Sequence, residues 1–134
     1  MKAITICQPF AWGVIHGPKV YENRSWPSSY RGLLLIHAGK SRKYLDDDPE
    51  FDGQPSDRDL TFGAIIGVVR MIDCLPVARA RPTPCAEGPY CHEYADAYAF
   101  FEPVPCLGML GHWDVPPQVE SLVRDQLAAI RINP

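Results

Sequence analysis

One segment of this chain constrains its fold more than any other. Residues 31–39, RGLLLIHAG, are apolar at successive positions in their middle. Alternate side chains of a strand point to opposite faces, so a strand of this kind has to be covered on both sides. We therefore predict a buried central strand here. A second core strand is predicted over residues 63–77, GAIIGVVRMIDCLPV.

Shorter segments predict further strands around these two. They are rich in β-branched or aromatic residues, or alternate in polarity, and several of them are flanked by residues that favour turns. These segments are residues 2–7, 21–26, 98–104 and 108–116. A short helix is also predicted within residues 92–101, before the strand at 98–104.

Two longer helices are predicted, one near each end. Residues 8–17 begin with Gln-Pro and end with Gly17, which are typical helix start and stop signals. Residues 117–131 begin at a Pro-Pro pair and carry apolar residues near helical spacing. With strands between the two helices, this order indicates a mainly β (α+β) fold, a small β-barrel with peripheral helices.

A polar segment separates the two core strands. Residues 41–60, SRKYLDDDPEFDGQPSDRDL, are acidic and rich in Asp and Pro, and we predict an exposed loop there. Loops of this length in compact domains are often functional. The chain has 134 residues, which fits a single domain over residues 1–134.

Composition limits the partners and the location that we expect. The formal net charge is -3, so a nucleic-acid site would have to be a local patch. No window nears the roughly 20 apolar residues of a membrane span, and we recognise no secretory signal. The 5 Cys match no disulfide framework, which is typical of a cytoplasmic protein. Cys85 and Cys91 are too far apart for paired zinc ligands, so we predict no metal and no cofactor.

Charged and aromatic residues gather in residues 17–26, GPKVYENRSW. The ammonium of Lys19 could hold a phosphate, or act as a base or nucleophile if desolvated. On the strand that follows, Glu22, Arg24 and Trp26 share one face. Arg24 could grip a phosphate or a base edge, and Glu22 could accept from an amino group or move a proton. Trp26 could stack on a base. A structural ion pair and plain core packing are the alternative interpretations.

Three more residues join the candidate ligand-binding site. Gln8, at the start of the first helix, could hydrogen-bond a base edge or cap the helix. His37 closes the strand at 31–39, where it is either a hydrogen-bonded core residue or a cleft residue. Lys40 belongs to GKSRK, the densest basic cluster in the chain. That cluster could form a positive rim or a merely solvated face.

Taken in order, these motifs resemble the ASCH domain family of the PUA-like superfamily. The chain has a Gln-Pro helix, a Gly-x-Lys-x-x-Glu-x-Arg segment, a Tyr-Arg-Gly strand ending in His-Ala, a Gly-Ala-Ile-x-Gly strand and a closing Gly-x-Trp strand. The resemblance runs from about residue 4 to residue 115. It implies a PUA-like barrel with a cleft beside the first helix, where RNA or a nucleotide-like ligand binds.

Three functions remain open at this point, beside that of a structural or interaction protein with no ligand. The first is binding of single-stranded RNA, or of a modified nucleoside or nucleotide, through Lys19, Glu22, Arg24 and nearby rings. The second is a metal-independent amidohydrolase that acts on an acylated nucleoside such as N-acetylcytidine, as one branch of the family does, with Lys19 and Glu22 as catalytic residues. The third is a ribonuclease in which Lys19, Arg24 and His37 stabilise the phosphate in the transition state.

One departure from the family favours binding over catalysis. In the deacetylating branch a Thr stands three residues after the Lys and serves as the nucleophile. This chain has Glu22 at that position. A hydrolase would therefore need direct attack by water, with Glu22 as the base.

Overall fold

The computed structural model describes residues 1–46 and 48–134. Within them the chain forms six strands, two α-helices and a short 3-10 helix. In chain order these are β1 Lys2–Ile6, α1 Phe10–His16, β2 Tyr21–Arg24, β3 Gly32–Ala38, β4 Ala64–Pro76, η1 Val77–Arg79, β5 Tyr90–Pro105, β6 His112–Asp114 and α2 Pro117–Ala129.

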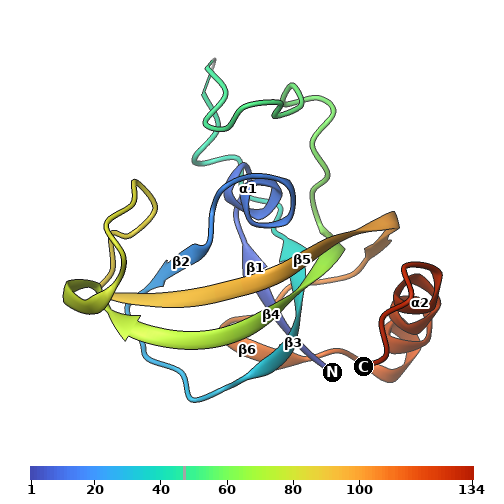
Figure 1. The fold of residues 1–134 in the computed structure, drawn as a ribbon. Helices are drawn as coiled ribbons and strands as arrows, with labels where there is room; N and C mark the ends of the chain where they lie inside the picture. Colours follow the sequence, from blue (N-terminus) through green and yellow to red (C-terminus); the bar gives the residue numbers. More distant parts are fainter. Residues whose placement is uncertain (47) are drawn as a thin grey trace.

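All of these strands belong to one sheet, in the order β2-β5-β4-β3-β1-β6. β1 and β3 run parallel, and the other neighbouring pairs are antiparallel. The sheet curls into a half-barrel, with α1 across one opening and α2 beside the sheet (Figure 1). The prediction of a mainly β fold, a small barrel with an N-terminal and a C-terminal helix, is confirmed.

β3 is buried on both faces, as its sequence predicts. Leu34 and Ile36 point into one cluster of apolar side chains, which also includes residues of α1. Leu35 points into a second cluster, where Val123 and Leu127 of α2 cover the sheet. Alternate side chains of one strand therefore serve two cores. The curled sheet is held from both sides, and the site lies where its loops meet α1.

Two predictions about the later strands are wrong. No helix forms within residues 92–101, because β5 runs unbroken through them. It pairs with β4 along its length and buries Tyr94. The closing strand is also shorter than the predicted 108–116, since β6 has 3 residues. The segment before it, residues 106–111, is a loop that lies beside the site.

Residues 41–46 and 48–60 form an irregular segment that runs above α1 in Figure 1, and residue 47 of the predicted loop lies outside the described residues. Most of its described side chains are exposed, but Phe51 is buried against the helix. Gly13 makes room for this ring, because a Cβ at that position would lie 2.4 Å from it. One aromatic side chain therefore anchors the loop to α1.

Side chains join the two edges of the curled sheet. β6 pairs with β1 only at residues 2–4, so the carbonyl of Thr5 can accept from outside the ladder. Arg24 of β2 donates to this carbonyl from Nη2 at 2.8 Å. Nearby, the ring of Trp26 lies edge-on to that of His112, with 5.1 Å between the ring centroids. We call this line of contacts between β2 and the β1–β6 edge the seam.

Candidate functional site

Three charged side chains from residues 17–26 meet at one place. Lys19 Nζ lies 3.5 Å from Glu22 Oε1, and Arg24 Nη2 lies 2.9 Å from Glu22 Oε2. Lys19 also donates to the carbonyl of Tyr21 at 2.6 Å. The carboxylate is thus held between two cations, and both of its oxygens are engaged. The sequence prediction that these three residues converge agrees with this geometry.

This charged cluster is largely removed from water. Lys19 is 6% exposed and Glu22 is 8% exposed, while the Arg24 side chain keeps 23% of its surface. Burial of a charge is costly unless it is paired, and here each cation has the shared carboxylate as its partner. Two cations and one carboxylate leave one formal positive charge. Arg24 is the member of the cluster that is most exposed to solvent, so this positive charge is accessible there.

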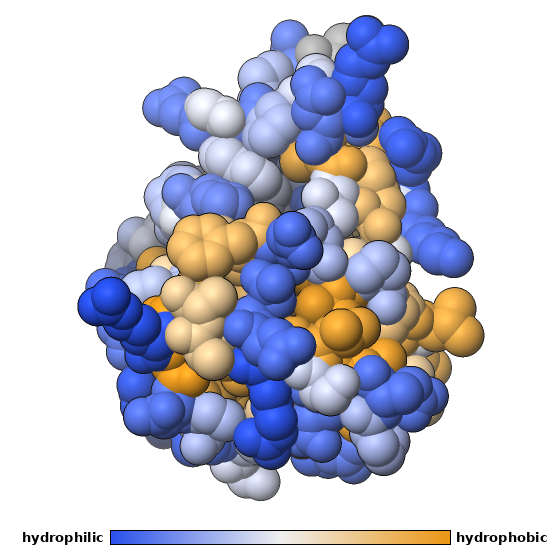
Figure 2. Space-filling view, turned by 90° about the vertical axis from the view of Figure 1, so that its right-hand side faces the viewer, coloured by the Kyte–Doolittle hydropathy of each residue, from blue (hydrophilic) through white to orange (hydrophobic). Residues whose placement is uncertain are grey.

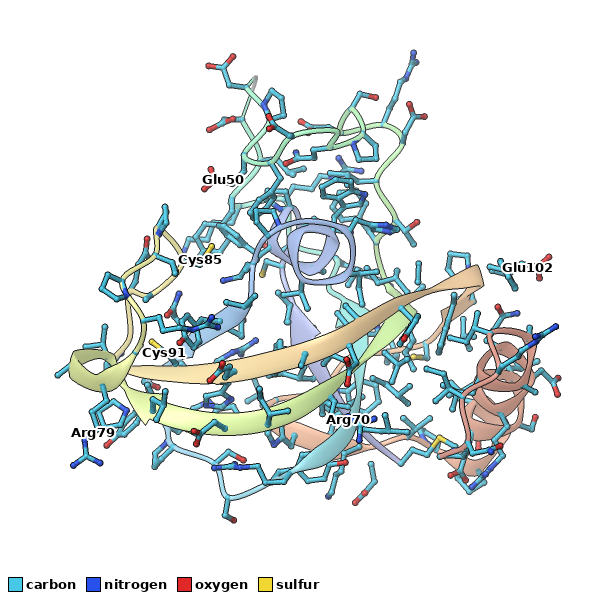
Figure 3. The ribbon with its side chains drawn as sticks, viewed as in Figure 1. Glu50, Arg70, Arg79, Cys85, Cys91 and Glu102 are labelled. Atoms are coloured by element: carbon cyan, nitrogen blue, oxygen red, sulfur yellow. The ribbon has the colours of Figure 1, made fainter. Side chains whose placement is uncertain are left out.

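These residues form the floor of a cleft of about 410 Å³, which we call the first cleft. Its floor also includes residues 5–7, at the end of β1. Two loops make its walls: Tyr44, Glu50 and Phe51 come from one, and the other contributes residues 84, 85 and 87. Glu50 and Cys85 lie on these two loops, on the same side of the molecule (Figure 3).

Asn23 holds one wall of the first cleft in place. Its Nδ2 donates to the carbonyl of Cys85 at 2.9 Å, and its Oδ1 accepts from the amides of Glu87 and Gly88. A single amide side chain therefore fixes the backbone of a loop that has no strand or helix of its own. Residue 23 positions the wall, while its neighbours on β2 supply the charges.

The first cleft combines aromatic walls with carboxylates. Phe10 lies edge-on to Tyr44, with 5.5 Å between centroids, and to Phe51, with 6.5 Å. The charged lining residues are Lys19 and Arg24 against Glu22, Glu50 and Glu87. Aromatic faces with nearby carboxylates suit a flat ligand that carries amino groups, such as a nucleobase.

A second cleft, of about 530 Å³, adjoins the first. Thr5, Cys7 and Arg24 line both clefts. The remaining lining residues are His37, Gly39, Lys40, Cys106 and residues 107–111. Arg24 thus stands at the boundary between two hollows. Two further residues of the predicted site, His37 and Lys40, belong to the second hollow rather than to the first.

His37 is buried at the base of the second cleft. Its Nε2 lies 2.9 Å from the carbonyl of Cys106, and because a carbonyl only accepts, Nε2 carries the proton. Nδ1 is then an acceptor, and it has no hydrogen-bond partner among the described residues. Burial lowers the pKa of His37, and the charge of Lys40 lowers it further, against the opposing effect of the Cys106 carbonyl. The ring is therefore neutral near pH 7.

Gln8 and Trp26 lie away from both clefts. Gln8 is 1% exposed; its Oε1 accepts from the amide of Trp12 and its Nε2 donates to the carbonyl of Thr61. It therefore stabilises the first turn of α1 and connects the helix to Thr61, in the segment before β4. Trp26 packs against the first apolar cluster and contacts His92 and His112. Both side chains serve the fold in this arrangement.

Polar groups also lie inside the barrel, beneath the seam. His92 Nε2 donates to the carbonyl of Trp26 at 3.0 Å, and His112 Nδ1 lies 3.3 Å from Ser28 Oγ. Burial lowers the pKa of His92 and lowers that of His112 to about 4, with the charge of His92 as the next cause. Burial raises the pKa of Tyr94 well above its usual value. These groups are neutral near pH 7, and His92 lies opposite Glu22 in the ladder between β2 and β5.

Several cleft residues were not predicted from the sequence. Tyr44, Glu50 and Phe51 belong to a segment without periodicity, residue 107 was assigned to no element, and residues 108–111 were assigned to a strand. An isolated Phe within an acidic loop is the one signal that could have pointed to Phe51. Within residues 1–46 and 48–134, no cluster of His, Cys, Asp and Glu could hold a metal ion. No helix in the described part is long and apolar enough to cross a bilayer.

Comparison with known proteins agrees with the motifs. No curated protein matches the chain. The family model for the ASCH domain matches residues 4–108, which includes most of β1 and all of α1, β2, β3, β4 and β5. The matched region therefore contains the charged cluster and the greater part of both clefts. This chain belongs to the ASCH domain family, a family of PUA-like, RNA-binding domains.

Proposed function

We propose that this protein binds an unpaired nucleotide of RNA, with the base in the first cleft and the phosphate at Arg24. The charged cluster carries the proposal. Three charged side chains are held at the floor of a cleft whose volume suits a small ligand, and the two cations exceed the carboxylate between them by one charge. The RNA-binding character of the family supports the same interpretation.

The distribution of charged side chains indicates where the base and the phosphate would bind. Glu22, Glu50 and Glu87 line the first cleft, so a phosphate deep inside it would meet three carboxylates. A carboxylate can instead accept from the amino group of a base. Arg24 lies at the border of the second cleft, where no acidic side chain is among the described lining residues. The phosphate is therefore expected at Nη1 of Arg24, because Nε and Nη2 already donate to Glu22 and to the carbonyl of Thr5.

The geometry favours binding over hydrolysis. Glu22 would have to act as the base in the absence of a hydroxyl nucleophile, yet its two oxygens are ion-paired with Lys19 and Arg24. Lys19 in turn donates to the carbonyl of Tyr21. A proton taken by Glu22 would weaken both ion pairs. Neither group is free for proton transfer in this arrangement.

Binding can be tested with fluorescently labelled single-stranded RNA and titrations followed by anisotropy. Lys19→Ala and Arg24→Ala should each weaken binding by about 1–3 kcal/mol, the size of a lost charge-assisted contact. Arg24→Lys keeps the charge and tests whether the planar fork is required. Arg70 is a matched control: it is exposed on β4, on the side of the molecule away from Glu50 and Cys85 (Figure 3). Arg70→Ala should leave the affinity unchanged.

Catalysis is tested in parallel with N-acetylcytidine and with RNA, in the presence of a chelator. If the wild-type protein turns over either substrate and both Lys19→Ala and Glu22→Gln abolish that turnover, the site belongs to a hydrolase and the proposal is wrong. If the wild-type protein binds no RNA, nucleotide or nucleoside at low salt, the charged cluster is structural.

A further inference from the structure

We infer that the ligand is a single-stranded RNA of at least two nucleotides, the second of which occupies the second cleft against residues 107–110. The inference rests on the proposed function of the first cleft. It adds a second binding subsite and excludes a free nucleoside as the full ligand. We call residues 107–110 the lip.

The two clefts meet where a linking phosphate is needed. Thr5, Cys7 and Arg24 line both hollows, whose volumes are about 410 and 530 Å³. Each volume lies within the range of sites that hold a small ligand. Neighbouring nucleosides in RNA are joined by one phosphate. A guanidinium at the boundary between two nucleoside-sized hollows lies where that phosphate would lie.

The charge of the second cleft fits a nucleic-acid backbone. Among its described lining residues the ionised side chains are Arg24 and Lys40, both cationic. Lys40 is exposed, and its aliphatic stem packs beside Gly63, which directs the ammonium to the surface of the cleft. The protein carries a net charge of -3, so this positive hollow is a local exception. Local positive charge of this kind attracts phosphates.

The lip supplies an apolar surface that the chain itself does not cover. Leu107 is 78% exposed, Met109 is 59% exposed and Leu110 is 97% exposed, and all three line the second cleft. Figure 2 shows apolar side chains protruding on the side of the molecule that carries α2, separated by polar ones. It is unusual for a small protein to expose three large apolar side chains within four residues. An unpaired base offers the flat apolar face that such side chains can cover.

The backbone of the lip is held close to the cleft. A Cβ at Gly108 would lie 2.6 Å from Thr5 Oγ1 and 2.9 Å from His37 Nδ1, so only glycine allows this approach. At the near end of the loop, the carbonyl of Cys106 accepts from His37, and its amide donates to the carbonyl of Gly63. The lip is therefore positioned by the same residues that form the base of the second cleft.

Ligand length tests this inference. Nucleoside 5′-monophosphates of the four bases and the corresponding 5′-phosphorylated dinucleotides are titrated into the protein, and affinities are read from NMR chemical shifts. The wild-type protein should bind the dinucleotide at least about tenfold more tightly than its mononucleotide, because a second base gains a stacking surface. Leu110→Ser should reduce this ratio to near one.

Two further variants sharpen the test. Leu122→Ser is the matched control, because Leu122 is also an exposed leucine, 52% exposed, but lies on α2. It should leave the ratio at the wild-type value. Lys40→Gln should lower the slope of log affinity against log salt by about 0.7 for the dinucleotide, the value for one lost phosphate contact on a single strand.

The outcomes separate this inference from the proposed function. If mononucleotide and dinucleotide bind equally, the second subsite is absent and the inference is wrong, while the proposed function stands. If neither binds, both fail together. If sedimentation shows a wild-type dimer that Leu110→Ser dissociates, the lip is a contact between two copies of the chain, which overturns the inference.

Discussion

Each residue of GPKVYENRSW that bears a charge or an amide has a separate structural task. Lys19 and Arg24 flank the carboxylate of Glu22, and Asn23 fixes the loop that ends in Gly88. Removing one charge from such a cluster leaves another without its partner, which costs more than the pair itself contributes. Stability therefore has to be measured alongside affinity for every variant of this cluster.

At the same scale, His112 should make the stability of the protein depend on pH. Its pKa is lowered to about 4 in the folded protein, mainly by burial, whereas an exposed histidine titrates near 6.5. Between these values the unfolded chain binds the extra proton, so unfolding becomes easier as the pH falls. The stabilising effect is complete above about pH 6.5. Below that, the free energy of unfolding should fall by roughly 1 kcal/mol per pH unit until the folded pKa is reached.

Urea denaturation at several pH values between 4.5 and 7.5 measures this slope. His112→Phe keeps an aromatic ring beside Trp26 but cannot titrate, so its slope should be smaller by about the contribution of one histidine. His92 and His37 also have lowered pKa values and should leave part of the slope in place. Equal slopes in the two proteins would show that His112 stays exposed to solvent.

The residue scale also shows what a sequence can predict about a site. Convergence of Lys19, Glu22 and Arg24 was predictable, because two of them share a strand face and the third lies just before it. The place of Trp26 was not, because its strand ends at Arg24 and the next residues turn towards the seam. Strand alternation holds only while the strand lasts. Gln8 accepts from the amide of Trp12, which corresponds to the second of its two predicted roles, at the start of the helix.

At the scale of elements, the fit between α1 and the loop at 41–60 depends on one missing methyl group. Gly13→Ala should force the ring of Phe51 out of its place, because the end of a side chain moves more easily than a helix backbone. The loop would then lose its buried anchor, and the first cleft would lose the wall that Phe51 forms. Limited proteolysis should cut the loop faster in this variant, by about tenfold for a loss of roughly 1.4 kcal/mol in local stability.

Phe51→Ala provides the comparison, since it removes the same anchor from the other side. The two variants should be cut at the same positions and at similar rates. Cleavage of Gly13→Ala at the wild-type rate would mean that the helix shifts to accommodate the methyl group and that the loop keeps its anchor.

β5 shows why element type is harder to predict than element position. The segment HEYADAYA contains residues common in helices, and a short helix was predicted there. Pairing with β4 overrides this preference, since Tyr94 faces Met71 across the ladder and both are buried. The central strands 31–39 and 63–77 were predictable because their apolar runs are long. The lip was not predictable, because its sequence LGML is apolar without being buried.

For the whole molecule, the C-terminal helix completes the fold although it lies beyond the matched family region. α2 buries Val123 and Leu127 against the outer face of the sheet. Leu127→Ala should lower the free energy of unfolding by about 2–5 kcal/mol, the usual cost of a cavity in a core. Leu122→Ala, on the same helix but exposed, should change it by less than about 0.5 kcal/mol.

Urea denaturation of the two variants at pH 7.5 measures the difference directly. Similar stabilities for Leu127→Ala and the wild-type protein would show that α2 is dispensable for the barrel. A loss confined to Leu127→Ala would show that burial of Leu127 against the sheet contributes to the stability of the fold.

A ligand that binds at Arg24 would also affect the contacts of the seam. Arg24 connects β2 to β1 across the opening of the half-barrel by donating to the carbonyl of Thr5, and the same side chain lines both clefts. A phosphate held by Arg24 would fix the rotamer that also spans the seam. RNA binding at Arg24 and the contact between Arg24 and Thr5 are then thermodynamically linked, so a change that stabilises one of them also stabilises the other. Hydrogen exchange should therefore slow at the amides of β1 and β2 when RNA is bound. A mutation that weakens the seam at a residue outside both clefts should also weaken RNA binding, although the mutated residue does not contact the ligand.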